Sequence, residues 1–200
     1  VRDGRSGTPD DRWAFTSKSS ALNYGSVAGL AAAARVLARQ DDALAQRALA
    51  MAERVWTQEQ GHAPNLFSHG NTTGGPLDAE MFAAAVELLR TTKKPIYARA
   101  VMTLWPRIEP HFAANAQTAV AAIPFMPAAY RAAMVPAVRQ WQAQSEAVAK
   151  ANPFGVPITI GGWAGSGTVL GHALTADALH RAALYLAFDV ARVNGFASVL

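Results

Sequence analysis

The sequence predicts an all-α protein made of antiparallel helical hairpins. Of its 200 residues, 51% are hydrophobic, which is enough for a substantial core in one domain. Alanine dominates this hydrophobic fraction and β-branched residues are sparse, a composition that favours packed helices over sheets. Apolar residues also recur at helical spacing through most of the chain. From this spacing we expect about seven helices, in a single domain over residues 1–200.

The first two helices are expected to form a hairpin. The first should begin near Ser19 or Ser20, and Asp41 and Asp42 should cap the second. The predicted apolar stripes are Val27, Leu30, Ala31, Ala34 and Leu37 in the first helix, and Leu44, Ala48, Met51 and Val55 in the second. Because almost no loop joins these helices, they must lie antiparallel.

A long loop over residues 60–75 leads into a third helix, where Pro76 suits the first turn and Asp78 and Glu80 suit the positive helix end. Further helices are expected over 95–106, 111–122 and 128–151, and Pro136 should kink or restart the last of these. A final helix is opened by Val169, Leu170, Ala173 and Leu174 and continues through Leu184. Long loops thus alternate with short connections. In rings of helical hairpins, this alternation places the long, substrate-binding loops on one face.

Composition excludes several classes of function. The net charge is +4, but the 18 basic residues are spread along the chain and form no basic block, which argues against a nucleic-acid partner. No apolar run approaches the ~20 residues of a membrane span, so we expect no membrane partner. There is no cysteine, and hence neither disulfide nor thiolate chemistry. The polar first residues do not form a signal peptide, and the missing initiator Met suggests a partial chain.

The glycine-rich loop NPFGVPITIGGWAGSG, residues 152–167, does not match phosphate-binding or nucleophile motifs. Gly165, Gly167 and Gly171 miss the dinucleotide-binding spacing by one residue, and no Gly-x-Ser-x-Gly surrounds Ser166. Two alternatives remain for Trp163. It packs over a neighbouring helix, or it stacks on the apolar face of a sugar. Arg12 and Trp13 also have two interpretations. Arg12 can hydrogen-bond to sugar hydroxyls while the Trp13 ring stacks on the sugar, or Trp13 can pack as a wedge over the end of the first helix.

Neither a metal site nor a cofactor is expected. His62 and His69 lie in one loop without neighbouring carboxylates, and His172 and His180 lie eight residues apart, too far round a helix for joint ligation. The acidic pairs at 10–11, 41–42 and 78/80 are best explained as helix caps. Trp56, Trp105 and Trp141 fall in helical stripes and are expected in the core.

Three segments resemble glycoside hydrolase family 9, the endoglucanase family, in the same order. They are DRWAFTSKSSALNY at 11–24, DAEMFAAAVEL at 78–88 and the loop at 152–167. The resemblance covers roughly residues 10–183 and leaves 184–200 unassigned. It implies a partial (α/α)6 toroid that acts on β-1,4-glucan by an inverting acid/base mechanism. It also implies a substrate-binding set, namely Arg12, Trp13, His69, Trp163 and Ser166, and a secreted or periplasmic location.

The sequence departs from the family at its catalytic positions. It has no Asp-x-Gly-Asp loop and no glutamate beyond Glu146, whereas an inverting hydrolase needs a carboxylate acid and a carboxylate base. We therefore expect the catalytic carboxylates to lie outside this chain and the chain alone to be inactive, with unpaired helix faces that favour self-association. Two alternatives are another α/α-toroid carbohydrate enzyme, such as a glucoamylase- or lyase-like protein, and a helical interaction module without activity.

Overall fold

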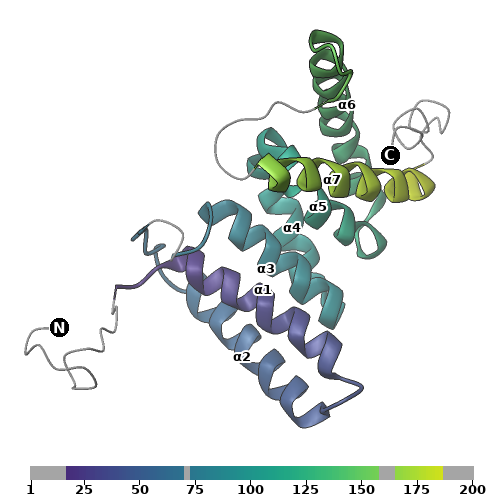
Figure 1. The fold of residues 1–200 in the computed structure, drawn as a ribbon. Coiled ribbons are helices and arrows are strands. Elements are labelled where there is room, and N and C mark those ends of the chain that lie inside the picture. The colour runs from purple at the N-terminus through teal and green to yellow at the C-terminus, as the bar shows by residue number, and fades with distance from the viewer. Residues whose placement is uncertain (1–16, 70–72, 158–164, 187–200) are drawn as a thin grey trace, which may run out of the picture.

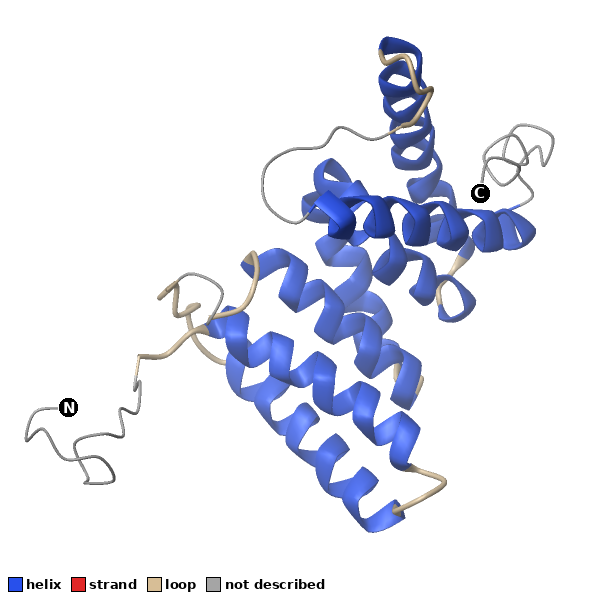
Figure 2. Cartoon of the chain, viewed as in Figure 1, coloured by secondary structure: helices blue, strands red, loops and turns tan. Residues whose placement is uncertain are grey.

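The structure, a computed structural model, describes residues 17–69, 73–157 and 165–186. The helices are α1 (Ser20–Leu37), α2 (Asp42–Gln60), α3 (Leu77–Thr92), α4 (Pro95–Ile108), α5 (Phe112–Ala122), α6 (Ala128–Ala151) and α7 (Gly165–Leu186), with 3-10 turns at Glu109–His111 and Ile123–Phe125. Across these described ranges the chain forms helices and loops without a β-sheet (Figure 2). No helix in the described part is both long enough and apolar enough to span a membrane.

The helices pack as hairpins in two layers. The odd-numbered helices lie side by side in chain order, with α1 against α3, α3 against α5, and α5 against α7 (Figure 1). Among the even-numbered helices, α2, α4 and α6 pack against α1, α3 and α5, the odd-numbered helices that precede them. This repeated pairing is the arrangement of an α/α toroid, of which the chain forms a part. The all-α fold predicted from composition and periodicity is therefore confirmed.

Helix directions alternate in the first four helices. Asn23 near the start of α1 donates to Glu59 near the end of α2 at 2.6 Å, and Arg107 of α4 pairs with Asp78 at the start of α3 at 2.7 Å. The starts of α1 and α3 thus lie with the ends of α2 and α4 and with the loop 61–76, a region that we call the loop end. The short connections at 38–41 and 93–94 lie at the opposite end of these helices (Figure 1).

Local signals set the helix boundaries. Ser19 caps α1 by accepting from the Leu22 N–H at 3.4 Å, and Asp41 caps α2 by accepting from the Leu44 N–H at 2.9 Å, as predicted. α3 ends at Lys93, whose φ of 61° places it in the left-handed region, and Pro95 then occupies the first turn of α4. The α1–α2 and α3–α4 connections are therefore short because each helix stops and restarts within a few residues.

Aromatic side chains form the centre of the core. The ring of Trp105 contacts those of Phe82, Phe112 and Tyr130, with centroids 5.4–6.5 Å apart. A second cluster joins Tyr24, Trp56 and Tyr97 in edge-to-face contacts across α1, α2 and α4. Trp56, Trp105 and Trp141 are all buried, which confirms their prediction as core residues.

Two sequence expectations need correction. The buried face of α2 consists of Ala45, Ala48, Ala52, Trp56 and Glu59, whereas Leu44 and Met51 of the predicted stripe are exposed. Alanines allow α1 to approach closely, and Trp56 anchors that face between Tyr24 and Tyr97. Pro136 lies inside a helix that runs from residue 128 to 151 without a break. Its missing N–H therefore costs one hydrogen bond but does not restart the helix.

Candidate functional site

The loop end brings polar residues of α1, α2, α3 and α4 together with the α2–α3 loop. The α2–α3 loop leaves Gln60 and is attached to the start of α1 by a short antiparallel bridge between Ser19 and Leu66. The Ser20 N–H donates to the Asn65 carbonyl at 2.9 Å, and the Asn65 N–H donates to Ser20 Oγ, also at 2.9 Å. Ser20 is fully buried, so this attachment is shielded from water and holds the loop against the helix.

The returning part of the loop is attached to the same helix. Ser19 Oγ donates to the Thr73 carbonyl at 3.1 Å, and Thr73 Oγ1 accepts from the His69 N–H at 2.8 Å. Gly74 follows with a φ of +86°, and a Cβ placed there would lie 3.1 Å from the carbonyl carbon of Ala21. Only glycine combines this backbone conformation with such a close approach. The loop is therefore held at both sides of His69.

Glu80 of α3 contacts both the loop and α1. Its Oε1 accepts from the Gly75 N–H at 2.7 Å, and its Oε2 lies 2.9 Å from the position that a Cβ on Gly25 of α1 would take. A Cβ at position 25 would therefore require the Glu80 carboxylate to move. Asp78, two residues earlier in the first turn of the same helix, pairs with Arg107. Both carboxylates thus have structural roles in the first turn of α3, where the sequence placed them, but they bond to Arg107 and to the Gly75 N–H of the loop rather than capping the helix.

A shallow pocket lies beside this loop. Its walls come from the start of α1, from loop residues 65–68 and from the turn that leads into α3. Phe67 is 43% exposed and Leu66 75% exposed, so an aromatic ring and an aliphatic side chain face water next to Ser68. An exposed ring among hydroxyl and amide groups can contact the apolar face of a polar ring-shaped ligand while its neighbours hydrogen-bond to the rim.

The predicted binding residues are described only in part. His69 lies exposed on the α2–α3 loop at the loop end, directly after Phe67 and Ser68. Ser166 falls in the first turn of α7, and its side chain is outside the described set. Arg12, Trp13 and Trp163 lie outside the described residues. That these five residues line one surface therefore stays a prediction.

Sequence analysis missed Glu59. This side chain is only 7% exposed, accepts from Asn23 Nδ2 at 2.6 Å and lies 3.6 Å from His62 Nε2. Its second oxygen, Oε2, is buried without a hydrogen-bond partner in the structure. Burial raises the pKa of neighbouring Tyr24; the hydrogen bond from Gln60 opposes this shift and the Glu59 charge adds to it. The available signal was the stripe Ala45, Ala48, Ala52, Trp56, which places residue 59 on the buried face.

No metal site is formed among the described residues, in which no three His, Asp or Glu side chains gather closely enough to hold an ion. The carboxylates of the loop end are engaged with the Gly75 N–H of the loop, with Arg107 of α4 and with Asn23 of α1.

Comparison with known proteins supports the fold. No protein-family model matches the sequence, and neither does any curated protein. The chain is similar in structure to a metagenome-derived glycoside hydrolase family 9 endoglucanase, with a TM-score of 0.59 and 24% sequence identity. The match covers 78% of this chain and 32% of that enzyme, so the chain spans about a third of the enzyme's length. The likeness shows a helical fold of the kind found in that enzyme.

Proposed function

We propose that this chain is part of the catalytic domain of a family 9-like glycoside hydrolase that acts on β-1,4-glucan. In this proposal the loop end carries glucan-binding subsites, and an inverting acid/base pair of carboxylates is supplied from outside the chain. The single observation that supports it best is the loop end itself, where an exposed ring, hydroxyls and an imidazole are held on a firmly attached loop. The enzyme to which the fold is similar is named an endoglucanase.

The substrate-binding residues of this proposal are Arg12, Trp13, His69, Trp163 and Ser166, and the structure adds Phe67 as a candidate. Trp13 and Trp163 would stack on glucose rings, and His69 would hydrogen-bond to a hydroxyl. No cofactor has a role in such a reaction. A polymer of this kind is met outside the cytoplasm, so the proposed location is secreted or periplasmic. The proposed domain is one partial catalytic unit over residues 1–200.

The first test is reducing-end release from carboxymethylated β-glucan by the purified, folded chain. We expect no turnover, because Asp78 and Glu80 are engaged with Arg107 and Gly75 and the sequence has neither an Asp-x-Gly-Asp loop nor a glutamate beyond Glu146. Turnover would mean that a working pair lies within the chain, and the assignment of catalysis to carboxylates elsewhere would be wrong.

The second test is binding of cellohexaose, followed by calorimetry. We expect saturable binding that Phe67→Ala weakens about 3- to 10-fold, the usual value of one ring contact. Ile96→Ala is the matched control, since Ile96 is an exposed apolar residue at the start of α4, away from the loop end, and should leave binding unchanged. A stable monomer without affinity for any oligosaccharide would favour the alternative of a helical interaction module. Tighter binding of starch or of uronic-acid polymers than of β-glucan would favour another α/α-toroid carbohydrate enzyme.

A further inference from the structure

An open cleft lies between three odd-numbered helices, away from the loop end. Its walls come from α3, α5 and α7 and its volume is about 440 Å³, within the range of ~300–1,000 Å³ usual for small-molecule sites. Arg90 lies roughly 15 Å further along α3 than Glu80, at the rise of an α-helix. The cleft is therefore separate from the proposed glucan surface.

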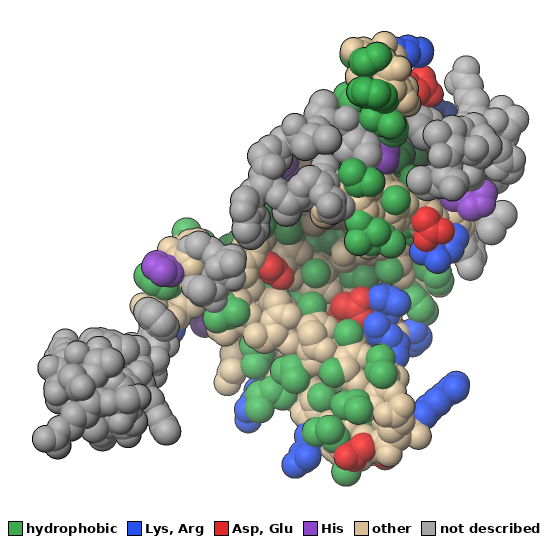
Figure 3. Space-filling view, viewed as in Figure 1, with side chains coloured by type: hydrophobic (Ala, Val, Ile, Leu, Met, Phe, Trp, Pro, Cys, Tyr) green, Lys and Arg blue, Asp and Glu red, His purple; other side chains and the backbone are tan. Residues whose placement is uncertain are grey.

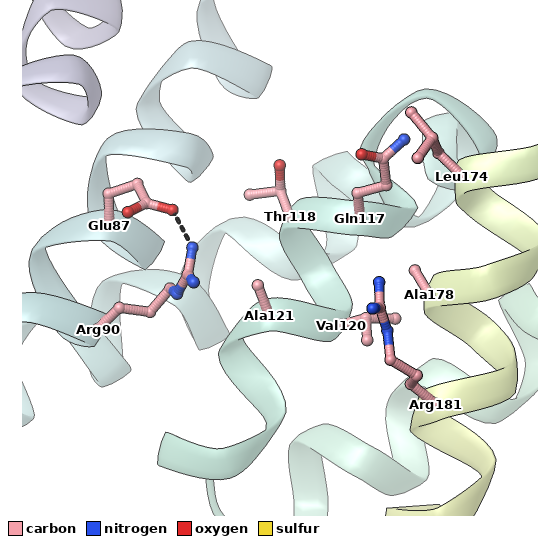
Figure 4. A pocket seen from close by; sticks show the side chains of 9 residues that line it. All are labelled: Glu87, Arg90, Gln117, Thr118, Val120, Ala121, Leu174, Ala178 and Arg181. Atoms are coloured by element: carbon pink, nitrogen blue, oxygen red, sulfur yellow. Dashed lines mark hydrogen bonds and ion pairs between the residues drawn. The ribbon is translucent and has the colours of Figure 1, made fainter. Parts of the chain in front are cut away.

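The cleft carries an arginine on each side. Figure 4 shows Arg90 of α3 on one side and Arg181 of α7 on the other, with Thr118 and Ala121 of α5 between them. A guanidinium group is planar, permanently charged and forked, and so matches the paired oxygens of a carboxylate or phosphate. Two such groups facing one space are suited to an anion.

Positive charge exceeds negative charge on the α3 side. A single carboxylate, that of Glu87, accepts from Arg35 Nη2 at 2.6 Å and also from Arg90. Lys93 adds a third cation, with its ammonium 3.6 Å from the centroid of the Phe125 ring. Burial, and then the charges of Arg35 and Arg90, hold the pKa of Lys93 below its usual value. An additional anion would offset this excess.

On the α7 side, Arg181 pairs, among the described residues, with an acidic residue of its own helix. It pairs with Asp177 at 2.5 Å, and both side chains are largely open to water, at 67% and 49% exposure. Exposed pairs one helical turn apart contribute little to stability. Arg181 can therefore exchange Asp177 for an incoming anion. In the space-filling view, acidic and basic side chains lie together over α3 and again over α7, with hydrophobic side chains nearby (Figure 3).

The rest of the lining indicates what the anion is attached to. Gln117 and Thr118 offer an amide and a hydroxyl, while Val120 and Ala178 form an apolar wall. We propose that this cleft binds a monosaccharide-sized anion, with a carboxylate or phosphate group between Arg90 and Arg181 and a hydroxylated body against α5.

The ligand class is tested by titrating the protein with D-glucuronate and with D-glucose 6-phosphate at constant ionic strength, using D-glucose as the neutral control. Calorimetry or amide NMR shifts of α5 and α7 report binding. We expect saturation by an anion and none by glucose. The anion that binds with the higher affinity shows whether the cleft prefers a carboxylate or a phosphate. Failure of both anions to saturate at concentrations on the order of 10 mM, or equal binding of glucose, would overturn the proposal.

Two substitutions on α7 should act in opposite directions. Arg181→Gln should weaken binding about tenfold, the effect of one charge-assisted contact, whereas Asp177→Asn should tighten it by removing the competing carboxylate. Both side chains are exposed, so the fold is preserved, and circular dichroism checks this. Arg54→Gln on α2 removes the same charge far from the cleft and should leave affinity unchanged. An equal loss in Arg54→Gln would show general attraction by net charge, and the site would be rejected.

Discussion

The first four helices and the pair α6–α7 are held together by different means. Helices α1 to α4 share a buried apolar core and are also joined by polar interactions at both ends. The Asn23–Glu59 hydrogen bond lies at the loop end, and the Arg35–Glu87 ion pair lies at the other end. α6 and α7 meet through Trp141 and His172, whose rings stack 4.9 Å apart, and Arg181 pairs within its own helix. Val169, Leu170 and Leu174 of α7 face water, and the end of α6 projects beyond the other helices (Figure 1).

This difference shows where the stability of the chain is concentrated. α3 is enclosed by α1, α4 and α5, and its residues 84–86, 88 and 89 are almost completely buried. The buried apolar surface of α3 contributes to the free energy of unfolding, and hydrogen bonds and ion pairs fix the ends of this helix. In contrast, α7 leaves part of its apolar surface in water. We therefore expect the α1–α4 unit to resist unfolding more strongly than α7.

The largest expected effect comes from a matched pair of leucines. Leu88→Ala in α3 should lower the free energy of unfolding by about 2–5 kcal/mol, because it leaves a cavity in a closed core, and Leu88 is 0% exposed. Leu174→Ala removes the same atoms from a side chain that is 44% exposed in α7 and should cost less than about 1 kcal/mol. Urea denaturation measures both. Similar costs would mean that the two regions do not differ as described.

A matched pair of glycines gives the next largest effect. Both Gly74 and Gly155 have positive φ, but only Gly74 has backbone atoms close to the position of an added Cβ. Gly155→Ala should therefore cost about 1 kcal/mol from backbone strain alone, and Gly74→Ala about 2–3 kcal/mol because the α1 backbone must also move. Thermal unfolding of both variants tests this order, which would be reversed if the loop end yielded more easily than the end of α6.

Hydrogen exchange compares the two regions without mutation. Amides in the middle of α3 should exchange only on global unfolding, whereas those of α7 should open at a free energy lower by about 1 kcal/mol or more. Mass spectrometry or NMR at several denaturant concentrations separates the two. Uniform strong protection of both helices would contradict the comparison and also the expectation that unpaired helix faces weaken the chain.

The smallest effect concerns pH. Burial holds the pKa of His172 below its ordinary value of about 6.5, so the unfolded chain takes up a proton at a higher pH than the folded chain. Stability is then complete above about pH 6.5 and falls as the pH drops below it, by less than about 1 kcal/mol because the ring is partly screened by water. His172→Phe keeps a ring against Trp141 but cannot titrate. Its stability relative to wild type should rise between pH 7.5 and 5, and a constant difference would refute the assignment.

Local sequence signals predicted much of the fold. Ser19, Asp41 and Pro95 act within one helical turn, so the starts of α1, α2 and α4 could be predicted without knowledge of the neighbours. The short α1–α2 connection likewise forced an antiparallel hairpin. The candidate site was predictable only as a loop containing His69, since loop position follows from the same boundaries.

The buried faces and the candidate site depended on contacts between distant residues. Ala-rich helices have weakly defined stripes, so the buried face of α2 was set by the approach of α1 and by Trp56 between two tyrosines. The burial of Glu59 and the exposure of Phe67 depend on the same packing. The sequence by itself determined the helices and most of their boundaries, because those follow from interactions a few residues apart. The predicted alternation of long and short loops does not hold after α3, since α3–α4, α4–α5 and α5–α6 are all joined by short connections. Only the tertiary structure decided which faces are buried, that Glu80 holds the loop beside α1, and that Arg90 and Arg181 line one cleft, because each depends on contacts between residues far apart in the sequence.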